Sequence, residues 1–237
     1  MEALNAWAQS FWQQFDFNLI QGDRYKMLLS GLGVTIEIAL AAAVLGVILG
    51  SLIALMRLSN ARIGRCYWLR GIARVYVDTI RGTPVMVQLL IMYYIILATY
   101  NGPKVLVAIL SFGLNSAAYV SEMVRGGILS VDKGQTEAGR SLGLSSTATL
   151  MLVVMPQAIK NTLPALFNEF IMLLKETSIV GYIALMDLTK AGDFIRSRTF
   201  SAFFPLLTVA AIYLVLVLGL SAIFGRVERR VRQGDHR

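Results

Sequence analysis

Cysteine and histidine are almost absent from this chain of 237 residues, which has one of each. The single cysteine, Cys66, excludes an internal disulfide, and the single histidine, His236, stands in the tail. The sequence therefore offers almost no cysteine or histidine ligands for a metal site and almost no histidine base for catalysis. The sequence also lacks a glycine-rich loop that ends in Gly-Lys-Ser/Thr, so the chain does not bind ATP by that route.

Charged residues are scarce as well. They make up 15% of the chain, whereas a soluble domain has about 25%. Hydrophobic residues make up 56%, and two long stretches, 82–103 and 199–225, carry no charge at all. Because a helix needs about 20 apolar residues to cross a bilayer, the sequence predicts an all-α, polytopic membrane helix bundle.

Glycine, proline or charge marks most ends of the apolar runs. We expect five spanning helices, at 27–56, 75–99, 104–124, 147–174 and 201–225. A further apolar stretch, 177–186, is too short to span and is expected to form a short or re-entrant piece. No internal repeat or second domain is visible. The spans form one transmembrane domain, 27–225, followed by a basic tail, 226–237.

Residues 1–26 are expected to form an N-terminal interfacial segment. Aromatic residues recur there at spacings of three and four, namely Trp7, Phe11, Trp12 and Phe15. This pattern is typical of an amphipathic helix at the membrane interface, where tryptophan prefers to lie. A cap packed over the bundle explains the same pattern equally well.

The distribution of lysine and arginine predicts the orientation of the chain. The 57–74 loop, the 125–150 loop and the tail together hold thirteen of these residues, and the segments on the other side hold seven. Short cytoplasmic loops are enriched in lysine and arginine. The N-terminus should therefore lie outside and the C-terminus in the cytoplasm. The net charge of +8 then reports topology, and we expect no nucleic-acid partner.

The 125–150 loop contains a short polar stretch. Residues 136–142 can form two helical turns, and Gly143 suits a helix C-terminus because glycine adopts the left-handed conformation without penalty. Ser145, Ser146 or Thr147 can cap the next helix. Small residues at 138 and 139 would let a partner approach closely. From these residues alone, a docking helix and an ordinary cytoplasmic loop are equally good interpretations.

The full spacing favours the docking helix. Glu137-Ala138-Gly139, three residues, Gly143, nine residues and then Val153-x-Met155-Pro156 resembles the EAA motif of ABC importer permeases. That pattern is Glu-Ala-Ala, three residues, Gly, nine residues, then Ile-x-Leu-Pro. The three departures are conservative in size or polarity, and they keep the hinge glycine and the proline.

Four other stretches narrow the resemblance to the polar amino-acid permeases, such as those of histidine, glutamine and arginine importers. They are "LLSGLGVTIEIAL" at 28–40, "RGTPVMVQL" at 81–89, "LNSAAYVSEMVRGGI" at 114–128 and "LLKETSIVGYI" at 173–183. The resemblance runs from about residue 20 to residue 225, nearly the whole chain.

The resemblance implies a type I ABC importer permease fold in the bacterial cell membrane. The EAA loop would be the coupling helix, in which Glu137, Ala138, Gly139 and Gly143 meet a cytoplasmic ATPase. Two such ATPases would hold ATP and Mg²⁺, so this chain would bind no cofactor and would not be an enzyme. They would rock two permease subunits, identical or homologous, by alternating access. An extracytoplasmic binding protein would deliver the amino acid.

Three polar residues within the expected spans are candidates for substrate contact, because charge in hydrocarbon is costly and is functional by default. They are Glu37, Asn115 and Glu169. An amino acid is a zwitterion, so its site needs an acceptor for the ammonium group and donors for the carboxylate. We favour Glu169 and Asn115. An ion pair or polar packing with a partner subunit is the alternative for Glu169, and a hydrogen bond between helices is the alternative for Asn115.

Other polar residues of the spans have simpler interpretations. Glu37 lies on the first span, which is expected to be peripheral, so a buried partner or a dimer contact fits it better than substrate. Asp78 with Arg81, and Glu122 with Arg125, are pairs three residues apart near helix ends and are expected to act as anchors. Tyr93 and Tyr94 are expected to pack.

Three other functions compete with the amino-acid importer. A permease of the same superfamily for methionine or another small solute is the nearest. A secondary transporter or channel would show inverted repeats or proton-relay acids, and five spans do not divide in two. A membrane enzyme would need a catalytic constellation, which the composition does not supply.

Cys66 provides a test of the orientation. Because it lies among five arginines in the 57–74 loop, we expect it to face the cytoplasm. An impermeant maleimide should label it in inside-out vesicles and not in intact cells. Labelling from outside would invert the orientation of every span.

Overall fold

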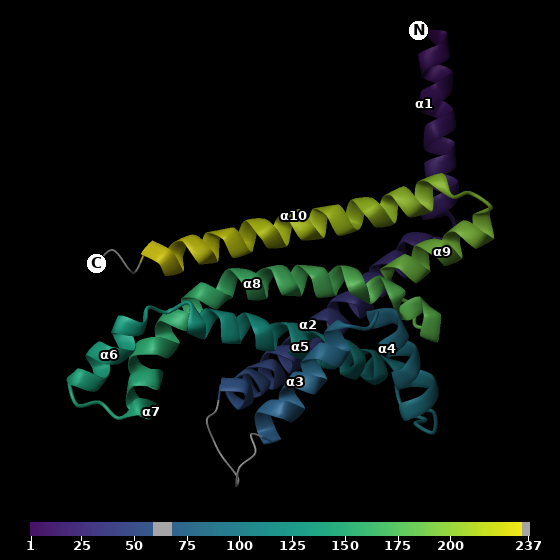
Figure 1. Cartoon of the computed structure of the whole chain (residues 1–237). Coiled ribbons are helices and arrows are strands. Elements are labelled where there is room, and N and C mark those ends of the chain that lie inside the picture. Colours follow the sequence, from purple (N-terminus) through teal and green to yellow (C-terminus); the bar gives the residue numbers. More distant parts are fainter. Residues whose placement is uncertain (59–67, 234–237) are drawn as a thin grey trace.

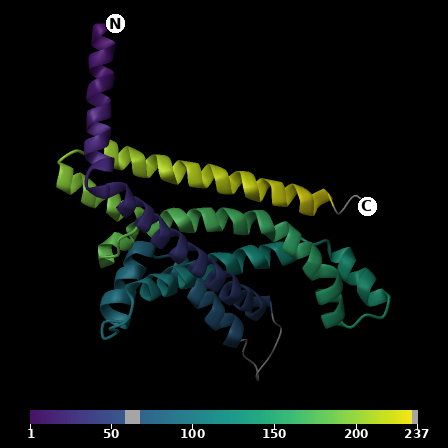
Figure 2. The same ribbon diagram turned by 180° about the vertical axis from the view of Figure 1, so that it is seen from behind.

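The computed structural model describes residues 1–58 and 68–233, without the side chains of residues 2–8, 232 and 233. Every regular element in this part of the chain is a helix, as the sequence predicts. Cys66 and Trp7 fall outside the described side chains. The helices over residues 104–129, 155–176 and 203–233 run roughly along one axis, which we take as the membrane normal, and the helix over 24–58 crosses them obliquely (Figures 1 and 2).

The N-terminal segment crosses this axis. It consists of α1 (Glu2–Phe15), the short π-helix η1 (Asp16–Ile20) and the short 3-10 helix η2 (Gln21–Asp23). It leads into α2 (Arg24–Leu58). In Figure 1, α1 stands away from the bundle, nearly at right angles to α10 (Phe203–Gln233). The rings of Phe11 and Phe15 contact Phe204 of α10. Trp12 points outward. The base of α1 is therefore packed, while its aromatic edge is exposed.

The centre of the bundle is the pair formed by α2 and α5 (Lys104–Leu129). Small residues allow the two backbones to approach closely. A Cβ atom added at Gly50 would lie 2.8 Å from the carbonyl oxygen of Ala117, and one added at Gly46 would lie 2.7 Å from Oγ of Ser116. Close approach through glycine is the usual way in which helices associate inside a bilayer.

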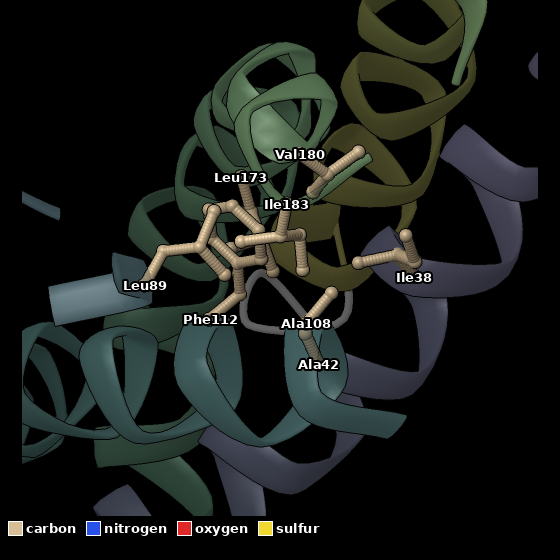
Figure 3. Packing of buried hydrophobic residues seen from close by; sticks show 8 residues of the cluster. All are labelled: Ile38, Ala42, Leu89, Ala108, Phe112, Leu173, Val180 and Ile183. Carbon is tan, nitrogen blue, oxygen red and sulfur yellow. The ribbon is translucent and has the colours of Figure 1, made fainter. Parts of the chain in front are cut away.

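The main hydrophobic core lies against this pair (Figure 3). It draws on five elements and consists of Ile38, Ala42, Leu89, Ala108, Phe112, Leu173, Val180 and Ile183. Leu89 comes from the short helix over 85–91 and Ile183 from the short helical segment over 177–183. The core therefore fixes those two segments as well as the spans.

The second expected span differs from the prediction of one helix over 75–99. The structure has α3 (Trp68–Arg81), then α4 (Val85–Ile91) with the turn η3 (Met92–Ile96), bent by 107° at the break. Pro84 explains the break, because it has no N–H to continue the ladder and forces the preceding residue out of the helical region. The described part thus has four helices long enough to span, and a fifth span if the bent pair counts as one.

The remaining spans match their predicted positions more closely. The short helices α6 (Lys133–Ser141) and α7 (Ser146–Thr149) are followed by the turn η4 (Leu150–Val154) and α8 (Met155–Glu176). The expected short piece at 177–186 is the turn η5 (Thr177–Ile183), which continues α8. A short helix, α9 (Leu188–Thr199), then leads to α10. The first part of the basic tail is helical, because α10 extends to Gln233.

The segments predicted to be cytoplasmic gather at one end of the bundle. The C-terminal end of α2, the start of α3, the α6–α7 pair and the end of α10 all lie toward the same end in both views (Figures 1 and 2). The α9 helix and the loop after η3 lie at the other end. The segments between successive spans therefore lie at alternate ends of the bundle, as a chain with five spans requires.

The close packing of α2 on α5 predicts a matched pair of glycine substitutions. Gly50→Ala should lower the free energy of unfolding by about 1–3 kcal/mol, because the new methyl would overlap the carbonyl oxygen of Ala117 and the branched side chain of Val120. Gly33→Ala, on the same helix, has nothing within 4 Å of the added carbon and should have little effect. Thermal unfolding in detergent measures both. Equal shifts would contradict the close-packing account.

Candidate functional site

The polar helix of the 125–150 loop is present and is capped at both ends. The side chain of Asp132 accepts a hydrogen bond from the backbone N–H of Gly134 at the start of α6. Gly143, just past the end, has φ of +85°, the left-handed conformation predicted for it. Ser145 then caps α7 by accepting from the N–H of Ala148 at 3.1 Å. The structure thus confirms the helix and the hinge, and Ser145 is the cap among the three predicted candidates.

Two of the motif residues on α6 are exposed and one is not. Glu137 and Ala138 face solvent, whereas Gly139 is buried. A Cβ atom added at Gly139 would lie 2.7 Å from Cγ2 of Thr149. The close approach expected at Gly139 is therefore made by α7 of the same chain. Small size at this position lets α6 and α7 pack as one unit.

A residue that the sequence analysis missed completes the exposed surface of α6. Leu142 is 84% exposed, next to the hinge. Arg140 turns back on the hinge, where its Nη1 donates to the carbonyl oxygen of Leu144 at 2.7 Å. The signal for Leu142 was a lone leucine inside a polar stretch, directly before a glycine that ends a helix.

The second part of the candidate site is the buried carboxylate of Glu169, on α8. Its side chain is 8% exposed. Oε1 accepts a hydrogen bond of 2.9 Å from the hydroxyl of Ser116 on α5. Among the described residues no cation pairs with Glu169. The charge is therefore held in the bundle by one neutral donor, which leaves acceptor capacity for another group.

Asn115 faces a different neighbour. Its Nδ2 donates to Oε1 of Gln88 at 2.9 Å. The Nε2 of Gln88 in turn donates to the carbonyl oxygens of Ile80 and Thr83, at 2.7 and 3.1 Å. Asn115 and Gln88 thus brace the break between α3 and α4, where backbone groups have lost their helical partners. Ser116 of α5 thus contacts Glu169, while the neighbouring Asn115 contacts the break.

A cluster of charges at the predicted cytoplasmic end joins three helices. Glu122 of α5 pairs with Arg57 of α2 and with Arg125, one turn further along α5. Arg81, at the end of α3, lies 3.7 Å from the same carboxylate and stacks over the ring of Tyr119. The predicted pair of Glu122 with Arg125 is confirmed. The predicted pair of Asp78 with Arg81 is wrong, because Arg81 turns toward the carboxylate that α5 supplies.

The other polar candidates lie away from this centre. Glu37 is exposed on α2, which fits contact with another chain better than contact with substrate. Tyr93 packs on the main core as expected, whereas Tyr94 is 60% exposed, although its ring meets the ring of Tyr93 edge to face. In the described part of the chain, no group of three or more His, Cys, Asp or Glu side chains gathers as a metal ion would require.

Comparison with known proteins places this geometry in a family. The sequence profile described as "Binding-protein-dependent transport system inner membrane component" matches residues 46–233. The arginine transport system permease protein ArtQ of Bacillus subtilis (strain 168) is 38% identical over 210 residues, which cover 88% of this chain and 94% of ArtQ. The glutamine transport system permease protein GlnP of Escherichia coli (strain K12) is 33% identical, with 92% of this chain and 99% of GlnP covered.

Solved structures show the same fold. A crystal structure of an amino acid ABC transporter with histidines aligns with a TM-score of 0.80 and 42% identity, covering 87% of this chain and 94% of that chain. An inward-facing structure of the MetNI methionine ABC transporter aligns with a TM-score of 0.77 at 19% identity, covering 89% and 99%. The second likeness concerns the fold alone.

Proposed function

Because the chain belongs to the family of binding-protein-dependent transport system inner membrane components, we propose that it is the translocation subunit of an ATP-driven importer for polar amino acids. The observation that carries the proposal is the α6 helix, which presents Glu137 and Ala138 to solvent at one end of the bundle. A bundle that moved solute on its own would have no need for a rigid, capped helix there. The relatives that transport glutamine and arginine support the substrate class.

The partners follow from this role. ATPase subunits and an extracytoplasmic binding protein belong to the family's mode of transport. In the proposed assembly two cytoplasmic ATPases hold ATP and Mg²⁺, and this chain holds no cofactor. A second permease subunit, identical or homologous, completes the path. In this proposal the chain lies in the bacterial inner membrane, with its N-terminus outside and its C-terminus in the cytoplasm.

The α6 surface is the proposed contact with an ATPase. Glu137, Ala138 and Leu142 together offer a carboxylate, a small side chain and an exposed apolar side chain, a combination that suits insertion into a groove. Gly139 and Gly143 act from behind this surface. The first lets α6 pack on Thr149, and the second sets the turn into α7.

Glu169 is the proposed acceptor for the ammonium group of the substrate. It is buried, it has one neutral hydrogen-bond donor, and a carboxylate inside a bilayer gains from a cation. Asn115 is the proposed donor to the carboxylate of the substrate. Its amide nitrogen has two N–H bonds, and one of them is committed to Gln88. The break braced by Asn115 would then sense the substrate directly.

Coupling can be tested on α6. Reversal of charge in Glu137→Arg, and Gly143→Val, should each abolish amino-acid uptake and substrate-stimulated ATP hydrolysis while the protein still inserts. Valine at a φ of +85° costs about 1–2 kcal/mol and would distort the turn. Gly126→Val, in a helix with open space around the added carbon, is the matched control. Both activities should be measured in proteoliposomes with the ATPase and the binding protein. Normal stimulated hydrolysis in both variants would remove the docking role.

Substrate recognition can be tested at Glu169. The Glu169→Gln variant keeps the shape and the contact with Ser116 but removes the charge. We expect apparent transport affinity to fall roughly tenfold to a hundredfold, because a charge-assisted hydrogen bond contributes about 1.5–3 kcal/mol. Basal ATP hydrolysis and assembly should be retained. Unchanged affinity would exclude the substrate role, and loss of assembly would instead make Glu169 a packing residue.

A further inference from the structure

Two arginines line one hollow at the end of the bundle where α1 joins it. Figure 1 shows α9 beside the first part of α2 at this end, and Leu28 of α2 shares a hydrophobic core with Leu188 and Ile195 of α9. The start of α2 and the second half of α9 line an open hollow of about 280 Å³, whose lining residues are Gly22, Arg24, Met27, Phe194, Ile195 and Arg198. None of these residues carries a carboxylate, so the hollow is positively charged.

Each guanidinium group of the hollow lies over an aromatic ring. The Cζ atom of Arg24 is 5.2 Å from the ring centroid of Phe17, and one of its N–H groups donates to the carbonyl oxygen of the same residue. The Cζ atom of Arg198 is 5.0 Å from the ring centroid of Phe194. A guanidinium group that is stacked in this way still presents N–H donors in its plane. These donors match the geometry of an oxyanion.

The carboxylates nearest to these arginines in the sequence have other partners. Asp23 forms an ion pair of 2.7 Å with Lys26, and Asp193 forms one of 2.7 Å with Arg196. In the part of the chain that the structure describes, neither arginine of the hollow takes part in an ion pair. Like charges beside one hollow repel each other, and an anion between them would remove that repulsion.

The hollow lies where two lipid-facing spans begin. Arg24 is the first residue of α2, and Arg198 stands shortly before Phe203, the first residue of α10. The spans that contain α2 and α10 are the two most apolar spans of the described chain. Both expose apolar side chains near their starts, because Leu29 is 59% and Phe203 is 62% exposed. Arginine at the end of such a span normally lies at the level of the lipid headgroups.

We propose that this hollow binds the phosphate group of an anionic phospholipid, in the membrane leaflet at this end of the bundle. The unesterified oxygens of a phosphodiester carry its negative charge and accept paired hydrogen bonds from guanidinium groups. Because the hollow has two cations and no acid, it should prefer phosphatidylglycerol to a lipid whose headgroup also carries a cation. One arginine comes from α2 and the other from α9, so the bound phosphate would tie these two helices together. The inference does not depend on the proposed transport function.

Native mass spectrometry of the full-length protein, purified in detergent with any subunits that accompany it, tests the proposal. The protein is titrated with palmitoyl-oleoyl phosphatidylglycerol, and the mass of each complex counts the lipids bound. Arg198→Gln removes one charge from the hollow, and Arg24→Lys keeps the charge but loses the planar fork of N–H donors. Arg196→Gln is the matched control, because it makes the same change on the same helix at a guanidinium group that Asp193 already pairs.

The apparent affinity for the first phosphatidylglycerol should fall about tenfold in Arg198→Gln and by a smaller factor in Arg24→Lys, because charge-assisted hydrogen bonds are lost. The Arg196→Gln control should bind the lipid as the unchanged protein does. Equal affinity in Arg198→Gln and the unchanged protein would overturn the proposal.

Three comparisons separate the phospholipid from other anions. Displacement of the lipid by an equal concentration of inorganic phosphate would overturn the proposal and make the hollow a site for a free anion. Phosphatidylcholine that binds as tightly as phosphatidylglycerol, and loses as much affinity in Arg198→Gln, would contradict the preference for an anionic lipid. Weaker binding of the extracytoplasmic binding protein to Arg198→Gln, with an unchanged lipid titration, would also overturn the proposal and assign the arginines to a protein contact.

Discussion

A polar group inside a bilayer has no water to bond, so each such group in this chain must meet another part of the protein or an aqueous path. This constraint accounts for much of the architecture. Ser116 faces Glu169 because the carboxylate needs a donor. Gln88 reaches back to Ile80 and Thr83 because the break before Pro84 frees their carbonyl oxygens. Asn161 of α8, although exposed, donates to the hydroxyl of Ser130, just past the end of α5, at 3.0 Å.

The α5 helix is where these requirements meet. Ser116 bonds to α8, Asn115 bonds to α4, and Glu122 gathers arginines from α2 and α3. Its close packing on α2 through Gly46 and Gly50 fixes its position. These contacts tie α2, α3, α4 and α8 to one central helix.

The sequence predicted the features that depend on local chemistry. Hydropathy located α2, α5, α8 and α10, and the glycine preference for a left-handed conformation located the hinge at Gly143. The bend at Gly82–Pro84 was missed because an uncharged apolar run looks the same whether it is straight or broken, although the proline was a local signal for it. Contacts between segments that are distant in the sequence could not be predicted either. Nothing near Arg81 in the sequence indicates that it turns to Glu122 instead of Asp78, and nothing near Asn115 indicates Gln88.

The burial of Gly139 was unpredictable for the same reason, and it bears on how the two parts of the site communicate. With no side chain at Gly139, Thr149 of α7 fits against α6. A tilt of α6 would therefore displace α7 directly, since there is no gap between them to absorb it. The chain continues from α7 through η4 into α8 without a loop. Glu169 is carried on that same helix. A movement imposed at the exposed end of α6 would thus reach the buried carboxylate through continuous helical backbone, and the contact between Gly139 and Thr149 is the point at which it enters.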